Sequence, residues 1–180
     1  FRNLKKRLMP ERAAQNDTQG SLFDMAETQE ETDDFENIKT VETDYKLIIT
    51  KKETEEFAEL LNQQAAFCFD TETTSAEPLK AKLVGMSFSW KKGNAYYVTI
   101  KGNELKEKEI VDLFKPILED DSKNIIAQNA KYDMLVMRQF DIYLGHNLFD
   151  TMIAHYLIQP ELPHNIDSIA ERYLNYKKVT

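Results

Sequence analysis

The stretch Ala66-Phe67-Cys68-Phe69-Asp70-Thr71-Glu72-Thr73-Thr74-Ser75 is an apolar run that ends abruptly in two acids. The apolar residues 67–69 predict a short buried strand, because polar residues bound them on both sides. Side chains two apart on a strand point the same way, so Asp70 and Glu72 present two carboxylates on one side. Carboxylate oxygens suit hard ions such as Mg²⁺ and Mn²⁺. Two acids can also simply end a strand, so this triplet alone does not decide the function.

A second stretch, residues 124–135 (NIIAQNAKYDML), also leads from a strand to an acid. Its apolar residues 125–127 predict a strand, and the apolar spacing from Tyr132 onward predicts a helix. Asp133 falls in the first turns of that helix, where the helix dipole favours a negative charge. We therefore expect Asp133 to stay ionised and to be available as a ligand.

Together the two stretches resemble the first two exonuclease motifs of the bacterial DNA polymerase I family (family A). Residues 67–73 read F-x-F-D-T-E-T, and residues 128–133 read Q-N-x-K-Y-D. The resemblance continues through residues 83–88, 149–152 and 167–174, and covers roughly residues 43 to 180. The chain is identified on these motifs as similar to the proofreading exonuclease part of that family.

The resemblance implies an α/β fold, namely a ribonuclease H-like mixed sheet with three antiparallel strands, then parallel strands, and flanking helices. It also implies 3′–5′ exonuclease activity, in which two divalent ions, Mg²⁺ or Mn²⁺, hydrolyse the 3′-terminal phosphodiester of DNA. In that family's arrangement Asp70 would bridge both ions and Glu72 would contact the ion on the nucleophile side. Asp133 would hold the second ion through water.

The family also uses a third motif, a tyrosine and an aspartate, which would lie beyond Thr180. We therefore expect the chain to be truncated before that motif and to be poorly active alone. A catalytically silent domain that serves as a structural spacer and a DNA-binding platform for the polymerase is the alternative. The intact acids Asp70, Glu72 and Asp133 favour the active reading.

A single-stranded 3′ end of DNA is the substrate that the resemblance implies. The residues expected to line its site are Thr73, Ala76, Gln128, Asn129, Lys131 and Tyr132. Ala76 stands where the family often has a larger apolar wedge, and helix packing is an equal alternative for Tyr132. Trp90 and the pair Tyr96-Tyr97 could stack bases, but aromatic residues on a hairpin are more often part of the core.

The composition permits this reading without proving it. A chain of 180 residues with 42% hydrophobic content can form one domain and a tail. The net charge of −8 is unexpected for DNA binding, but residues 24–36 hold seven acids and no base, so the excess is local. The single cysteine, Cys68, excludes an internal disulfide, fits a reducing cytosol and is expected to be a buried small hydrophobe rather than a nucleophile. With no long apolar run and no signal peptide, a cytoplasmic protein without membrane contact is expected.

Three segments are expected along the chain. Residues 1–12 resemble the end of a preceding 5′ nuclease-like domain, residues 13–40 have the composition of an acidic flexible linker, and residues 41–180 form the exonuclease domain. The polymerase and 5′ nuclease domains of the same protein are therefore expected partners. Within the linker, Gln19, Leu22 and Phe23 resemble the peptide with which bacterial proteins grip the DNA sliding clamp, although chance is an equal explanation.

Local patterns predict the elements of the domain in order. They are an edge strand at 45–49, a helix that Thr50 and Glu53 start as a capping box, a hairpin of 83–90 with 95–100, a helix capped by Asn103, a strand at 125, a helix at 130, a short strand at 148–149, and helices over 151–158 and 166–175. The first helix should bury Phe57, Leu60 and Leu61. His146, His155 and His164 lack a partner ligand at metal spacing, and His155 is expected to be a satisfied core residue.

Overall fold

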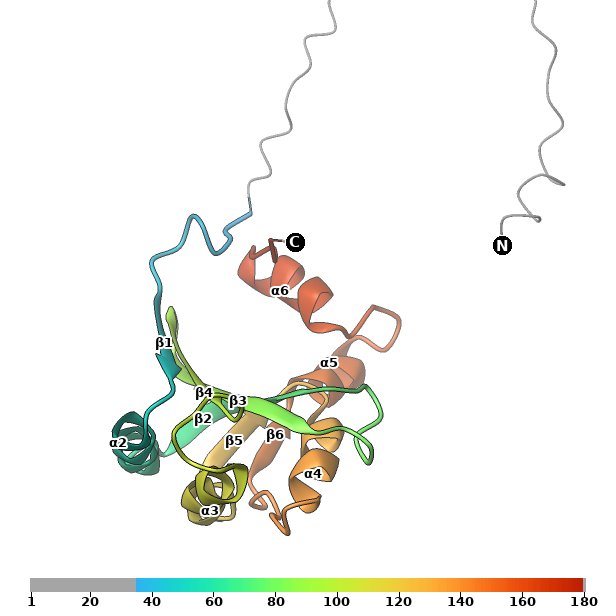
Figure 1. The fold of residues 1–180 in the computed structure, drawn as a ribbon. Coiled ribbons are helices and arrows are strands. Elements are labelled where there is room, and N and C mark those ends of the chain that lie inside the picture. The colour runs from blue at the N-terminus through green and yellow to red at the C-terminus, as the bar shows by residue number, and fades with distance from the viewer. Residues whose placement is uncertain (1–34, 180) are drawn as a thin grey trace, which may run out of the picture. The chain divides into compact units, whose positions relative to one another are not determined.

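A computed structural model describes residues 35–179, which form one mixed sheet covered by helices (Figure 1). The expected segment 1–12, most of the expected linker and the residues Gln19, Leu22 and Phe23 lie outside the described residues. Within residues 35–179, no helix is both long enough and apolar enough to cross a membrane.

The sheet has six strands in the order β1-β4-β3-β2-β5-β6. Their bounds are β1 Asp44–Ile48, β2 Ala66–Thr73, β3 Leu83–Lys91, β4 Asn94–Thr99, β5 Asn124–Ala127 and β6 Leu148–Asp150. The strands β2, β3 and β4 are antiparallel neighbours, whereas β5 runs parallel to β2 and β6 runs parallel to β5. β1 pairs in parallel with β4 at the edge. The expected order of three antiparallel strands followed by parallel strands is confirmed.

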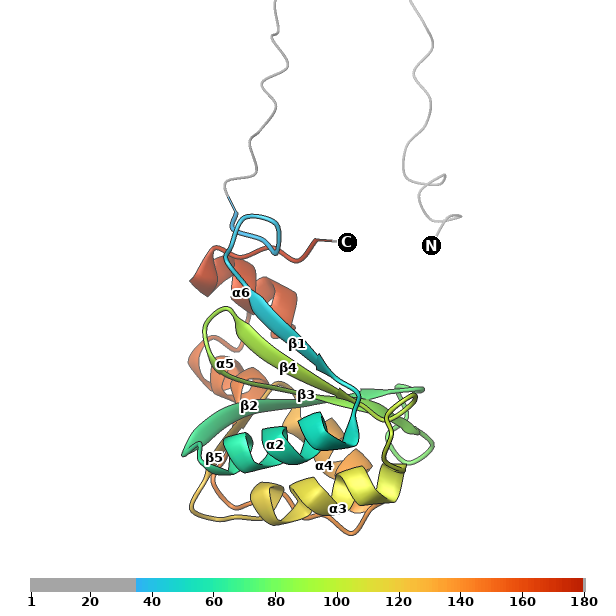
Figure 2. The same ribbon diagram turned by 60° about the vertical axis from the view of Figure 1, so that its left-hand side comes forward.

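Five helices accompany the sheet in the described part of the chain: α2 Lys51–Asn62, α3 Glu107–Leu118, α4 Ala130–Arg138, α5 Thr151–Ile158 and α6 Ile166–Leu174. Figures 1 and 2 show α2 and α3 side by side beneath the sheet, whereas α6 lies on the opposite side. Among these helices, only α2, α3 and α4 contribute residues to the main apolar core, which they share with the strands. The opposite face of the sheet is consequently open around β2 and β3.

The side chains of β2 alternate between these two faces. Phe67, Phe69 and Thr71 are buried against the helices, while Cys68, Asp70 and Glu72 face outward and are exposed. The prediction of a buried Cys68 is therefore wrong, because only one face of this strand is covered. Burial of part of its surface raises the pKa of the Cys68 thiol, which leaves it protonated rather than activated.

Two helix predictions need correction, although the capping box at Thr50 and Glu53 is confirmed. Leu60 is 38% exposed, because the buried stripe of α2 runs through Thr54, Phe57, Ala58 and Leu61. Asn103 does not cap α3. Its side-chain oxygen accepts from the backbone N–H of Leu105 in a local turn, and the helix begins only after Lys106.

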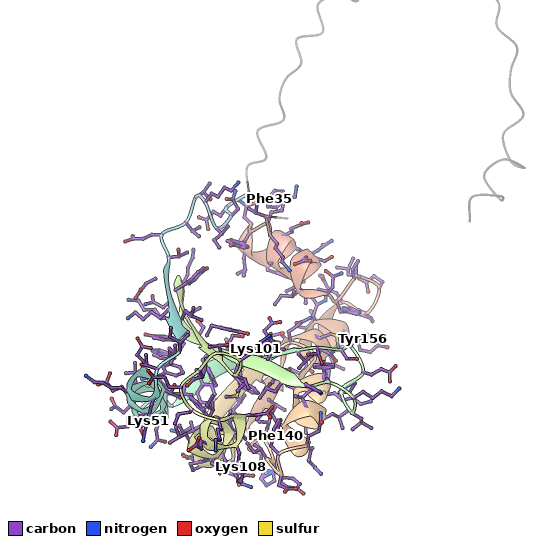
Figure 3. All side chains as sticks on the ribbon, in the orientation of Figure 1. Phe35, Lys51, Lys101, Lys108, Phe140 and Tyr156 are labelled. Carbon is purple, nitrogen blue, oxygen red and sulfur yellow. The ribbon has the colours of Figure 1, made fainter. Side chains whose placement is uncertain are left out.

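Residues 35–40, which were expected to belong to the linker, are described together with the domain. Glu36 forms a β-bridge with Tyr176. The Glu36 backbone donates to Asn175 O and accepts from Lys177 N, both at 2.8 Å. The Lys177 ammonium also lies 5.5 Å from the ring of Phe35, which is labelled in Figure 3. The last residues assigned to the linker thus pair with the segment that follows α6.

Candidate active site

The outward face of β2 forms the floor of a cavity of about 570 Å³. Asp70 and Glu72 enter it from the strand, and Asp133 enters it from the first turn of α4. The remaining lining residues are Thr71, Thr73, Thr74, Ser75, Ala76, Gln128, Asn129 and Tyr132. The structure therefore brings together all three acids that the sequence selected.

Asp133 is held in place by the strand. It is only 1% exposed, and its Oδ1 accepts hydrogen bonds from the Thr71 backbone N–H at 2.9 Å and from the Thr71 hydroxyl at 2.6 Å. Thr71 points inward between the two outward acids of β2, so one strand positions all three carboxylates. Sequence patterns did not identify Thr71, because its contact depends on how α4 packs against the sheet.

Asp150 fixes the start of α4, which carries Asp133. Its carboxylate accepts from the backbone N–H groups of Asn129 at 3.1 Å and Ala130 at 2.9 Å. It also caps α5 by accepting from Met152 and Ile153 at 2.9 and 3.3 Å. One side chain therefore satisfies the free N–H groups of two helices. Its place directly after a short apolar strand is a capping signal that sequence reasoning could have used.

The wall of the cavity is a loop that follows β2. The Tyr132 hydroxyl is hydrogen-bonded to the Thr73 hydroxyl and donates to the Ser75 carbonyl oxygen. Tyr132 therefore has a structural role, because its hydroxyl fixes the loop to α4. Farther along α4, Gln139 donates to the Pro78 and Ala81 carbonyl oxygens. The helix thus holds this loop at both ends.

Five of the six expected substrate residues line the cavity, namely Thr73, Ala76, Gln128, Asn129 and Tyr132. Lys131 does not line it and is exposed on the outer side of α4, one residue before the inward Tyr132. The Gln128 amide is engaged, since it donates to His164 O at 2.8 Å and accepts from the Thr151 hydroxyl. Gln128 thereby ties the cavity rim to the start of α5.

The acids perturb one another. Loss of solvent raises the pKa of Asp70 to about 6, and the charges of Asp133 and Glu72 add to the shift. The side chain of Asp70 is exposed to solvent, but the cavity walls displace enough of the surrounding water to raise its pKa. Burial also raises the pKa of Asp133, against the opposing hydrogen bonds from Thr71. Burial therefore acts against the helix dipole, which favours the ionised form of Asp133.

The donor set suits a hard divalent cation. Three carboxylates share one cavity whose lining residues carry no positive charge, and the charges of Asp133 and Glu72 add to the rise in the pKa of Asp70. A bound Mg²⁺ or Mn²⁺ would supply that charge and accept oxygen ligands. Within residues 35–179, no three acidic, histidine or cysteine side chains are already grouped as ligands of one ion.

The histidines differ from expectation. His155 and His164 lie together, with their Nδ1 atoms 2.7 Å apart, although nothing in the sequence spacing indicated a pair. His155 is buried, and its Nε2 has no hydrogen-bond partner among the described residues, so it is not fully satisfied. The loop between α5 and α6 reverses the chain and creates this contact. The pair joins α5 to that loop and is separate from the acids.

The aromatic residues of the hairpin divide between the two faces of the sheet. Trp90 and Tyr96 stack against each other at 4.7 Å and pack on Phe57, so their expected core role is confirmed. Tyr97 points to the opposite face, where loss of solvent and the charge of Glu72 raise the pKa of its phenol. Adjacent strand residues alternate, which is the signal that could have separated Tyr97 from Tyr96.

Comparison with known sequences gives a consistent result. Residues 45–180 match a family described as 3′–5′ exonuclease. DNA polymerase I of Borreliella burgdorferi is 36% identical over 168 residues, which is 92% of this chain and 18% of the relative. DNA polymerase I of Pseudomonas aeruginosa is 31% identical over 147 residues, covering 77% of this chain and 16% of the relative. The chain thus spans less than a fifth of these relatives.

Solved structures share the fold. The EXO domain of Aedes aegypti Nibbler aligns with a TM-score of 0.62 at 11% identity, covering 76% of this chain and 72% of that one. Brucella melitensis NrnC with bound Mg²⁺ aligns with a TM-score of 0.59 at 20% identity, covering 78% and 65%. At such identities the likeness concerns the fold alone. The fold is the ribonuclease H-like exonuclease arrangement expected from the sequence.

Proposed function

Because the chain belongs to the 3′–5′ exonuclease family of the family A DNA polymerases, we propose that it removes nucleotides from the 3′ end of DNA. It would do so as the proofreading part of a longer DNA polymerase I. The observation that carries this proposal is the meeting of Asp70, Glu72 and Asp133 in one cavity. The reaction adds water to the terminal phosphorus and breaks its bond to the 3′ oxygen of the preceding nucleotide.

Each acid would have a role that follows from its position. Asp70 is at the centre, since its pKa responds to both other acids, and it would bind two divalent ions. Glu72, exposed at the end of β2, would bind the ion beside the attacking water. Asp133, which already accepts a hydrogen bond from Thr71, would hold the second ion through water. When bound, such ions lower the pKa of water and stabilise the leaving oxygen.

The cavity rim would hold the substrate. Asn129 is the residue before α4 and adopts a left-handed conformation with φ 59°, which turns the chain sharply toward the acids. The wall formed by Thr73, Ser75 and Ala76 would contact the terminal sugar and base.

Metal binding gives the first test. Titration calorimetry of this chain with Mn²⁺ should show heat in the wild type and none in Asp70→Ala. Asp112→Ala is the matched control, because Asp112 is an exposed acid on α3 that pairs with Lys108. Equal heats for wild type and Asp70→Ala would overturn the assignment of the metal site.

Activity is tested in the longer polymerase that we propose contains this chain. Nucleotide release from a primer with a mismatched 3′ end should be lost in Asp70→Ala and retained in Asp112→Ala. If the wild-type protein releases no nucleotides while polymerising normally, the silent spacer is the correct reading.

A further inference from the structure

Tyr97 lies across β3 from the cavity acids in an unusual position. A Cβ placed on Gly85 would meet the Tyr97 hydroxyl oxygen at 2.2 Å and Cζ at 2.3 Å. The ring of Tyr97 therefore lies directly on the Gly85 backbone, in the space that any other residue's side chain would fill. A glycine at 85 is what allows the ring to reach this far along the sheet.

The strand register places this hydroxyl beside Glu72. Glu72 and Gly85 are direct antiparallel partners, so a side chain on either one would share a face with the other. Directly opposed Cβ atoms in such pairs lie roughly 5 Å apart. Since the Tyr97 oxygen lies 2.2 Å from the position that a Gly85 Cβ would take, a rotation of the Glu72 side chain can bring its carboxylate to this oxygen. Tyr97 itself does not line the cavity, so it reaches the site only through Glu72.

We propose that, when Glu72 binds a divalent cation, its carboxylate turns to accept a hydrogen bond from the Tyr97 hydroxyl, which holds Glu72 in position. This proposal rests on the proposed function, because it assigns a partner to one of the metal ligands. Carboxylates that bind metals are generally oriented by such neighbours, and losing one typically weakens metal binding about 10- to 100-fold. Tyr97 is thus a positioning residue, and Gly85 makes room for it.

The test measures Mn²⁺ affinity of the chain by calorimetry, independently of nuclease activity. Tyr97→Phe, which removes only the hydroxyl, should weaken Mn²⁺ binding about 10-fold. The midpoint of urea unfolding without metal should stay unchanged, which separates positioning from a structural role. Tyr45→Phe is the matched control. Tyr45 lies on β1 two residues before Leu47, which pairs with Tyr97. The Tyr45→Phe variant should bind Mn²⁺ with the affinity of the wild type.

A second variant tests the role of Gly85. Gly85→Ala should push the Tyr97 ring aside and weaken Mn²⁺ binding as much as Tyr97→Phe does. The double variant should be no weaker than Tyr97→Phe, since both changes remove the same hydrogen bond. Equal Mn²⁺ affinity in wild type and Tyr97→Phe would overturn this inference and leave the proposed function intact. A wild type that binds no Mn²⁺ would overturn both.

Discussion

Asp70 is the acid whose pKa is raised by the charges of both other acids, Asp133 and Glu72. Its folded-state pKa of about 6 lies above the value of an unfolded aspartate, about 4. Without metal, the folded protein therefore holds a proton that the unfolded chain has lost between these pH values. The stability contributed by the protonated form is complete below about pH 4 and is lost as the pH rises through about 6.

We expect Asp70→Asn to stabilise the metal-free protein above pH 6, because asparagine carries no charge. The gain should be about 1 kcal/mol after allowance for solvent screening, and it should vanish below about pH 4. Urea unfolding from pH 4 to 8 measures it, with Asp112→Asn as a control that should show no such trend. Adding Mn²⁺ should reverse the order and make the wild type the more stable protein. A gain that does not depend on pH would contradict this account.

At the scale of elements, Asp150 makes α4 and α5 depend on one carboxylate. Asp150→Ala leaves the starts of both helices without their acceptor, and each lost cap costs about 1 kcal/mol, so we expect a loss of about 2 kcal/mol. Asp150→Asn keeps an acceptor oxygen and should lose less. Urea unfolding measures both, with Asp167→Ala as a control because Asn165 already caps α6. An equal loss in the control would show that general charge effects are responsible.

The order of the elements could be predicted because each has its own local period and end signal. The convergence of Asp70, Glu72 and Asp133 could be predicted from the resemblance to the exonuclease motifs, which implies parallel strands whose carboxyl ends share one edge of the sheet. Exposure of Cys68 could not, because it depends on which sheet face the helices leave open. Asn103 was misassigned because a turn and a helix cap use the same side-chain chemistry. The pairing of His155 with His164 follows from a chain reversal that no sequence period encodes.

On the scale of the whole molecule, α5 and α6 leave a broad apolar surface uncovered. Leu157 is 76% exposed, Ile158 is 74% exposed, and Tyr156 projects from α5 at the outer side of the molecule (Figure 3). Exposed apolar patches of this kind promote association. The chain by itself should therefore associate as its concentration rises.

Replacing Leu157 and Ile158 with lysine should shift the chain toward monomer in sedimentation velocity experiments. Leu79→Lys is the matched control, since Leu79 is also 74% exposed but lies alone on the loop after β2. The control should associate like the wild type. Identical sedimentation of all three proteins would show that this surface does not drive association.

The bridge between Glu36 and Tyr176 has a mechanical consequence. Two backbone hydrogen bonds join the entry and the exit of the folded unit at one point. Tension applied through the flanking chain is carried by these bonds before it reaches the sheet. A pull between residues 35 and 177 would therefore break these bonds before it changed the spacing of Asp70, Glu72 and Asp133.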